Sequence, residues 1–116
     1  MEPKYRVLIH FDESDEKKQA FVLRNVRNML EDLGADQTLV KLVAHGPGVD
    51  IFLDQSAVPD GVEELRARGV LMLACRNTMR ERNIAHERLL PGIQLVPSGM
   101  GELVRGQLEG WIYVHP

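Results

Sequence analysis

Five short apolar segments alternate with segments of helical periodicity, and this alternation restricts the fold more than any other feature of the chain. Because the connections are too long for hairpins, the strands must run mainly parallel, and right-handed crossovers then place helices on both faces. We therefore predict an α/β fold, a three-layer α/β/α sandwich with a five-stranded, mainly parallel sheet, formed as a single domain by residues 1–116. The order of the strands does not follow from this pattern. The predicted strands are residues 5–11, 38–44, 70–75, 93–96 and 111–114.

Helix boundaries are predicted from residues that favour helix ends. Ser14 is a suitable N-cap for the helix after the first strand, with acidic residues behind it. Asn77 or Thr78 is expected to cap the helix after the third strand, and Ser98 the last helix. The segment HGPG at residues 45–48 breaks the chain sharply, and apolar residues behind it predict a short helix.

The composition excludes several classes of protein. The net charge is −3 with both signs interspersed, and aromatic residues are few and scattered, so neither nucleic acid nor an anionic membrane surface is an expected partner. No apolar stretch approaches the roughly 18 residues that a membrane span requires. The N-terminus lacks the apolar core of a signal peptide, and the lone cysteine cannot form an internal disulfide. We therefore expect a cytoplasmic protein.

The carboxyl ends of parallel strands share one edge of the sheet, where ligands and catalytic groups gather in open α/β folds. Cys75 ends the most apolar predicted strand and precedes a predicted helix, whose N-terminus would favour the thiolate. Cys75 is therefore the candidate catalytic residue. The candidate substrate-binding residues at the same edge are His10, His45, Gly46, Gly48, Arg76, Asn77, Thr78, Ser98 and Gly99.

Each candidate also has a purely structural interpretation. Free cysteine is often a small buried side chain, so Cys75 can line the core without reacting. His10 and His45 can hold a proton or stabilise a thiolate, or can serve structure alone. The glycines at residues 46–48 and 99–101 supply turn geometry, or let backbone amides approach an anion.

We predict no metal site and no cofactor. The acidic residues at positions 12–16 have the pattern of a helix entry, and no second ligand cluster has matching spacing. One cysteine and four dispersed histidines argue against structural zinc, and His86 and His115 are expected on the surface. The glycine segments match neither a Walker loop nor a dinucleotide-binding pattern.

The chain contains, in order, VLIHFDES, NVRNMLEDLG, VAHGPGVDIFL, GVLMLACRNTM and LLPGIQLVPSGMGELVRGQLEGWIYV. In this order and at this length the segments resemble the DsrE-like family, which includes DsrE, DsrF and the Tus sulfur-relay proteins. The resemblance implies a cytoplasmic α/β domain that forms a homo-oligomer, a trimer or a multiple of it. It also implies that Cys75 carries a persulfide and passes it to a partner. The CRNTM segment is more similar to a branch without an assigned function than to the relay proteins.

These features support two main hypotheses of function. In the first, Cys75 accepts sulfane sulfur as a persulfide from a donor and hands it to an acceptor, as in a sulfurtransferase or relay protein. In the second, the chain is a non-catalytic, oligomeric binding module for a small anionic ligand or nucleotide at the same edge. A third interpretation is an oligomeric interaction protein whose edge pocket has no use. The apolar residues 111–114 offer a surface that a partner subunit can cover.

Overall fold

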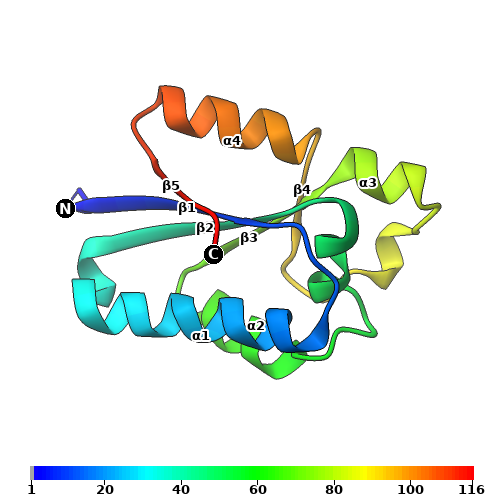
Figure 1. The fold of residues 1–116 in the computed structure, drawn as a ribbon, viewed down its shortest axis with the longest axis horizontal. Helices are drawn as coiled ribbons and strands as arrows, with labels where there is room; N and C mark the ends of the chain where they lie inside the picture. Colours follow the sequence, from blue (N-terminus) through cyan, green and yellow to red (C-terminus); the bar gives the residue numbers. More distant parts are fainter. Residues whose placement is uncertain (1) are drawn as a thin grey trace.

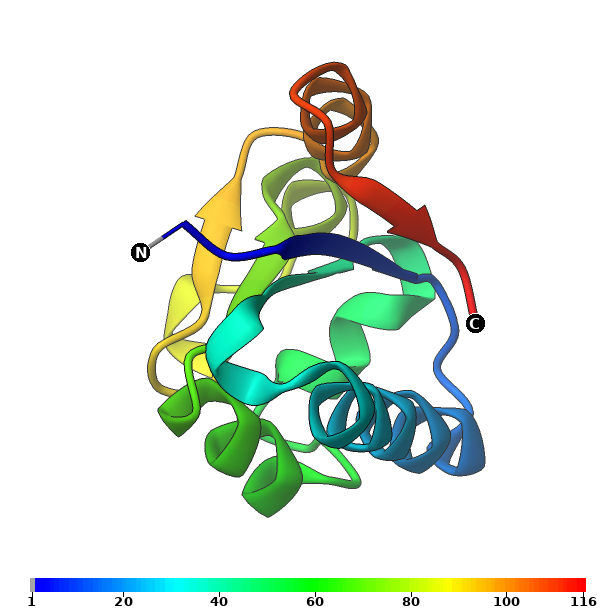
Figure 2. The ribbon, with the colours of Figure 1, turned by 90° about the vertical axis from the view of Figure 1, so that its left-hand side faces the viewer.

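The computed structural model describes residues 2–116, which form one five-stranded sheet (Figure 1). Its strands are β1 (Tyr5–Phe11), β2 (Thr38–Ala44), β3 (Leu71–Cys75), β4 (Gln94–Val96) and β5 (Ile112–Val114). The spatial order is β4-β3-β2-β1-β5, and every neighbouring pair is parallel. The prediction of an α/β fold with a parallel sheet is confirmed. The last strand, β5, pairs with residues 7–9 in the middle of the first strand, β1 (Figure 2).

Helices cover both faces of this sheet, as the three-layer prediction requires. The helices of the described residues are α1 (Glu16–Leu33), α2 (Pro59–Ala67), α3 (Arg76–Glu81) and α4 (Gly99–Leu108), with 3-10 helices η1 (Ala35–Gln37), η2 (Gly46–Phe52) and η3 (His86–Arg88). α1 and α2 lie on one face and α4 on the other (Figure 1). No helix within residues 2–116 is long and apolar enough to span a membrane.

The interior strand β1 is apolar from Val7 to Ile9 because both of its faces are covered there. Val7, Ile9 and Phe11 belong to the larger core on the side of α1 and α2. Leu8 points the other way and packs with Leu103 of α4 and with Trp111. Successive side chains of a strand point to opposite faces of the sheet. Because both faces are buried here, consecutive residues of β1 are apolar instead of alternating with polar ones.

The N-cap of α1 is Asp15, so the prediction of Ser14 is wrong by one residue. The Asp15 carboxylate accepts a hydrogen bond from the backbone N–H of Lys18 at 3.1 Å. An ionised carboxylate at a helix N-terminus also gains from the helix dipole, which a hydroxyl does not. Ser98 caps α4 as predicted, and its Oγ accepts from the N–H of Gly101 at 3.0 Å.

The predicted cap of α3 is also wrong, for a reason that bears on the site. β3 passes into α3 without a loop, so Asn77 and Thr78 lie inside the helix. Cys75, the last residue of β3, occupies the cap position. The prediction required at least one connecting residue between strand and helix, and the chain has none there.

The carboxyl ends of β1 and β2 are held together by backbone contacts. The N–H of His45 donates to the carbonyl oxygen of Phe11 at 3.2 Å. The short helix predicted after the HGPG segment is the 3-10 helix η2, which already begins at Gly46. Gly48 in this helix packs directly against the Phe11 carbonyl group and leaves no room for a Cβ. These contacts fix the polar residues after both strands at one edge.

Candidate functional site

The sulfur of Cys75 caps the helix that follows it. Its Sγ accepts a hydrogen bond from the backbone N–H of Thr78 at 3.4 Å. The residue is only 5% exposed, so the thiol lies just below the surface at the carboxyl edge of the sheet. The first amides of a helix have no partner within the helix, and here they face a sulfur atom.

The surroundings of this thiol favour its ionised form. Burial raises the pKa of the Cys75 thiol, but hydrogen bonds from the Thr78 hydroxyl and from the amides of Gly99, Thr78 and Asn77 outweigh burial and lower it. Donors that face the sulfur stabilise the thiolate, which is the nucleophilic form of cysteine. The exposed guanidinium of Arg76 is not among the causes of this lowered pKa.

Thr78 connects the thiol to the turn after β2. Its Oγ1 accepts a hydrogen bond from the N–H of Gly46 at 2.8 Å, and the residue is buried. The hydroxyl hydrogen remains available for the sulfur of Cys75. A chain of donors therefore runs from Gly46 through Thr78 to Cys75, and each hydrogen bond polarises the next. Arg82 secures the turn by donating to the carbonyl oxygen of Gly46 at 3.2 Å.

Gly99 lies between the thiol and a histidine. A Cβ at this position would lie 2.9 Å from the Cβ of His45 and 3.5 Å from the Cβ of Cys75. The missing side chain lets the start of α4 approach both residues closely, and the amide of Gly99 reaches the sulfur. The thiol and His45 are therefore neighbours across one glycine.

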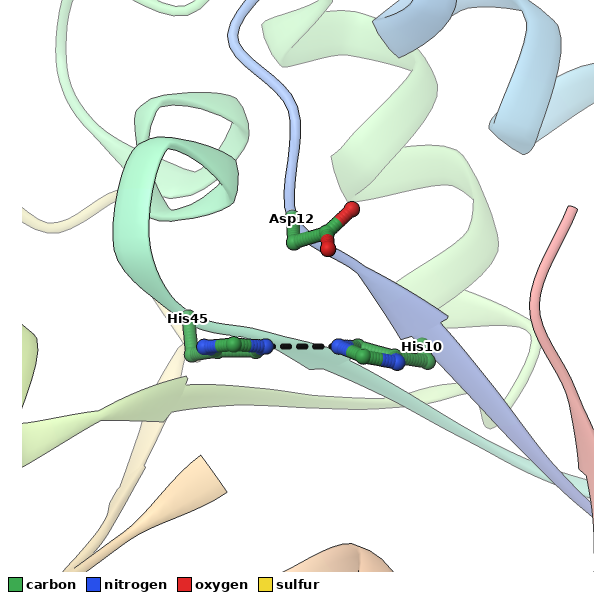
Figure 3. A group of neighbouring side chains, drawn as sticks. All are labelled: His10, Asp12 and His45. Carbon is green, nitrogen blue, oxygen red and sulfur yellow. Dashed lines mark hydrogen bonds between the residues drawn. The ribbon is translucent and has the colours of Figure 1, made fainter. Parts of the chain in front are cut away.

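His45 meets His10 edge to edge at the ends of β2 and β1 (Figure 3). Their Nε2 atoms are 2.6 Å apart, and the ring planes differ by 20°. At this distance one hydrogen lies between the nitrogens, so only one of the two rings carries it. The second nitrogen of His10, Nδ1, is 2.7 Å from the hydroxyl oxygen of Tyr113 on β5. His10 is buried, with both ring nitrogens paired.

Asp12 and His115 extend this histidine group toward the surface. His115 Nε2 lies 3.2 Å from Oδ1 of Asp12, and the His115 ring stacks on His10 at a centroid distance of 4.3 Å. Burial, then the nearby His115 and His45, lowers the pKa of His10, while Asp12 opposes this effect. Burial raises the pKa of Asp12, but the hydrogen bond with His115 and the surrounding imidazoles lower it overall. At neutral pH His10 is therefore neutral and Asp12 ionised.

Six of the ten predicted edge residues lie around the thiol and the histidine pair, and the other four have other roles or face the surface. Gly48 packs on the backbone of β1, and Ser98 caps α4. Arg76 is exposed, and the Asn77 side chain accepts a hydrogen bond from Arg80 on the surface at 3.2 Å. The residues gathered around the thiol and the histidine pair are His10, His45, Gly46, Cys75, Thr78 and Gly99.

Sequence reasoning misses three members of the histidine group: Asp12, Tyr113 and His115. The signal for His115 is present, because this residue directly follows the fifth predicted strand and so reaches the same edge as the residues after the others. The structure also brings together possible metal ligands that the sequence gives no signal for. Donor atoms of His10, Asp12 and His45 lie within 4.8 Å of one another, although no regular spacing links these residues in the sequence.

The site thus offers two kinds of chemistry side by side. The thiolate of Cys75 can attack an electrophilic sulfur, and its amide and hydroxyl donors stabilise it as a nucleophile and as a leaving group. The pair of His10 and His45, with Asp12 nearby, can hold a hydrogen or a cation at the same edge.

Comparisons with known proteins point to one family. The model described as the DsrE/DsrF-like family matches residues 6–116. A solved structure of a protein of unknown function, MTH1491 from Methanobacterium thermoautotrophicum, is 39% identical, with a TM-score of 0.92 over 97% of this chain and 99% of that one. The ychN protein from E. coli shares the fold at 16% identity, with a TM-score of 0.80 over 97% of this chain and 99% of its own. No curated protein matches the sequence.

Proposed function

The chain belongs to the DsrE/DsrF-like family, and from this premise we propose that it handles sulfur, carrying or transferring sulfane sulfur as a persulfide on Cys75. The observation that carries the proposal is the set of donors around the Cys75 sulfur, which lowers the thiol pKa. Persulfides form from the thiolate. A lone cysteine suits a carrier, because no second thiol in the chain can discharge the bound sulfur. A cytoplasmic location, where thiols stay reduced, is part of this proposal.

The proposed transfer consists of two displacements at sulfur. The Cys75 thiolate attacks the outer sulfur of a donor persulfide, a new S–S bond forms at Sγ, and the donor's S–S bond breaks. The bonding electron pair leaves with the donor, which departs as a thiolate. An acceptor thiolate then attacks the outer sulfur on Cys75, and Cys75 departs as a thiolate. Electrons and protons balance in each step, and the partners are a persulfide donor and a thiol acceptor.

The native protein, incubated with inorganic polysulfide and freed of excess reagent, is expected to gain one sulfur atom per chain, and Cys75→Ser none. Serine keeps the size of the side chain but removes the sulfur nucleophile. Intact-protein mass spectrometry measures the gain, and a reductant should remove it because the added sulfur is held by an S–S bond. Equal labelling of Cys75→Ser, or an unlabelled native protein with every sulfane donor tried, would contradict the proposal.

An anionic ligand or nucleotide has less support as the occupant of this edge. The cavity beside the turn after β2, about 360 Å³ in volume, has Asp50 and Glu81 in its wall. Its arginine, Arg82, is already paired with Asp50 at 2.7 Å. The N–H of Gly46 is donated to Thr78. The Arg82 guanidinium and the Gly46 amide are thus engaged by other groups of the protein, whereas the donors around Cys75 face the sulfur itself.

We also propose that the chain forms a homo-oligomer, through α4 and the edge strand β5. Met100, Val104 and Leu108 recur every four residues on α4 and are 55%, 62% and 87% exposed. Residues at this spacing share one helix face. Next to α4, the edge strand β5 exposes Ile112 and Val114, which point to the α1 side of the sheet. Exposed apolar surfaces of this kind mark interaction sites, and an edge strand has unpaired backbone groups. The family resemblance favours a trimer or a multiple of it.

Leu108→Glu is expected to weaken this assembly by more than about 100-fold, since an unpaired charge buried in an interface costs about 3–5 kcal/mol. Sedimentation velocity across a micromolar concentration series measures the change. The matched control is Phe21→Glu on α1, in the opposite layer, where the side chain is 41% exposed. A native protein that is monomeric throughout the series, or equal effects of the two substitutions, would refute an interface on α4.

A further inference from the structure

His10, Asp12 and His45 form a cluster of metal-binding side chains at the sheet edge (Figure 3). One donor atom from each residue lies within 4.8 Å of the other two. The three residues come from the end of β1 and from the positions just after β1 and β2. These strand ends are fixed to each other by the hydrogen bond from His45 to Phe11 and by the packing of Gly48. The cluster is therefore held by the framework of the fold.

Two imidazoles and one carboxylate suit a particular class of ion. Zinc and its neighbours in the first transition row bind nitrogen and carboxylate donors, whereas calcium and magnesium take oxygen ligands almost exclusively. Zinc sites with open coordination commonly have three protein ligands of these types and a water molecule. The donor set of His10, Asp12 and His45 thus favours a transition metal.

The groups behind these side chains match the outer shell of a metal site. A ligating histidine normally donates its other ring N–H to a nearby oxygen, which fixes the tautomer. Nδ1 of His10 lies 2.7 Å from the Tyr113 hydroxyl, which leaves Nε2 toward the cluster. The Asp12 carboxylate is held by His115 at 3.2 Å. The side chain of Asp12 is 36% exposed, so an ion and its water ligands can reach the cluster from solvent.

One adjustment is needed for binding. The two Nε2 atoms of His10 and His45 are 2.6 Å apart because they share a hydrogen. Two nitrogens bound to one tetrahedral zinc at about 2.0–2.1 Å lie roughly 3.3 Å apart. A small rotation of the half-buried His45 ring about its side-chain bonds opens this gap, and the metal then replaces the shared hydrogen.

We propose that His10, Asp12 and His45 bind one divalent transition metal ion of the zinc, cobalt and nickel class, with water completing the coordination. The site adjoins the thiol but is separate from the persulfide chemistry, which needs no metal. Cys75 is not one of the proposed ligands, because the cluster of donor atoms within 4.8 Å of one another consists of His10, Asp12 and His45.

The test uses the full chain without a histidine tag, treated with a chelator and then titrated with Zn²⁺ by calorimetry. One ion should bind per chain, and His10→Asn, His45→Asn and Asp12→Asn should each abolish binding. Circular dichroism checks that each variant is folded. Asp12 is partly exposed, so Asp12→Asn should fold even if a substitution of the buried His10 does not. Tyr113→Phe should weaken binding by about 10-fold, the lower end of the effect of an outer-shell partner. His86→Asn, at an exposed histidine of η3, should leave binding unchanged.

Cobalt distinguishes the proposed ligands from the thiol. The Co²⁺ complex should show no sulfur-to-metal charge-transfer band, and Cys75→Ser should bind Co²⁺ as the native protein does. Four results would each overturn the proposal: no binding by the native protein, binding that persists in folded His10→Asn and His45→Asn, loss of binding in Cys75→Ser, or equal loss in His86→Asn. Sulfur loading of Cys75 is measured separately, so neither result decides the other.

Discussion

Gly48→Ala should lower the free energy of unfolding by about 3 kcal/mol, the upper part of the usual range for overpacking. The new Cβ would lie 2.9 Å from the Cα of Asp12 and closer still to the carbonyl group of Phe11. All of these are backbone atoms, so no side-chain rotation can relieve the contact. The ends of β1 and β2 must separate instead, which also disturbs the edge that holds His10 and His45. Urea unfolding followed by circular dichroism measures the loss.

Gly46, two residues earlier in the same turn, provides the matched control. Its φ is +57°, and an added Cβ would meet nothing within 4 Å. Gly46→Ala should therefore cost only the left-handed backbone conformation, about 1–2 kcal/mol, and Gly46→Asn less, since asparagine adopts that conformation more readily. If Gly48→Ala were no more destabilising than Gly46→Ala, the close packing of η2 on β1 would be disproved.

The layers of this fold can be predicted from local sequence, but the order of its strands cannot. The alternation of apolar and helical segments indicates parallel strands covered on both faces, whatever their neighbours. Placing β5 beside β1 depends instead on contacts between distant parts of the chain, such as the packing of Trp111 with Leu8 and Leu103. No local pattern records such a contact. The predicted N-caps of α1 and α3 are wrong for a smaller reason, because propensity identifies a capping residue only within a position or two.

The same limit explains what is missing from the predicted site. Cys75 can be identified because its position after an apolar strand is a local feature. Tyr113 and His115 join His10 only because β5 pairs with β1, which brings together residues 103 positions apart. Asp12 has the appearance of a helix entry in the sequence, but Asp15 performs the capping and leaves the Asp12 carboxylate facing the histidines.

Thr78→Val is expected to slow the alkylation of Cys75 by about 10-fold at a pH below the thiol pKa, since a hydrogen bond to a charged acceptor contributes about 1.5–3 kcal/mol and 1.4 kcal/mol is a factor of ten. The Thr78 hydroxyl lowers the pKa of Cys75 and accepts from the N–H of Gly46. Valine has nearly the same shape but does neither. The pKa of the thiol should therefore rise, and the midpoint of the pH–rate profile for iodoacetamide should move upward.

Thr78→Ser is the matched control, because serine keeps the hydroxyl on the same Cβ and should react like the native protein. The backbone N–H of residue 78, which donates to Sγ at 3.4 Å, is present in all three proteins. The comparison therefore isolates the hydroxyl, provided that circular dichroism shows each variant to be folded. Sulfur loading should follow alkylation, slow in Thr78→Val and normal in Thr78→Ser. If the valine variant is folded and reacts as fast as the native protein, the hydroxyl does not stabilise the thiolate, and the persulfide proposal loses its principal support.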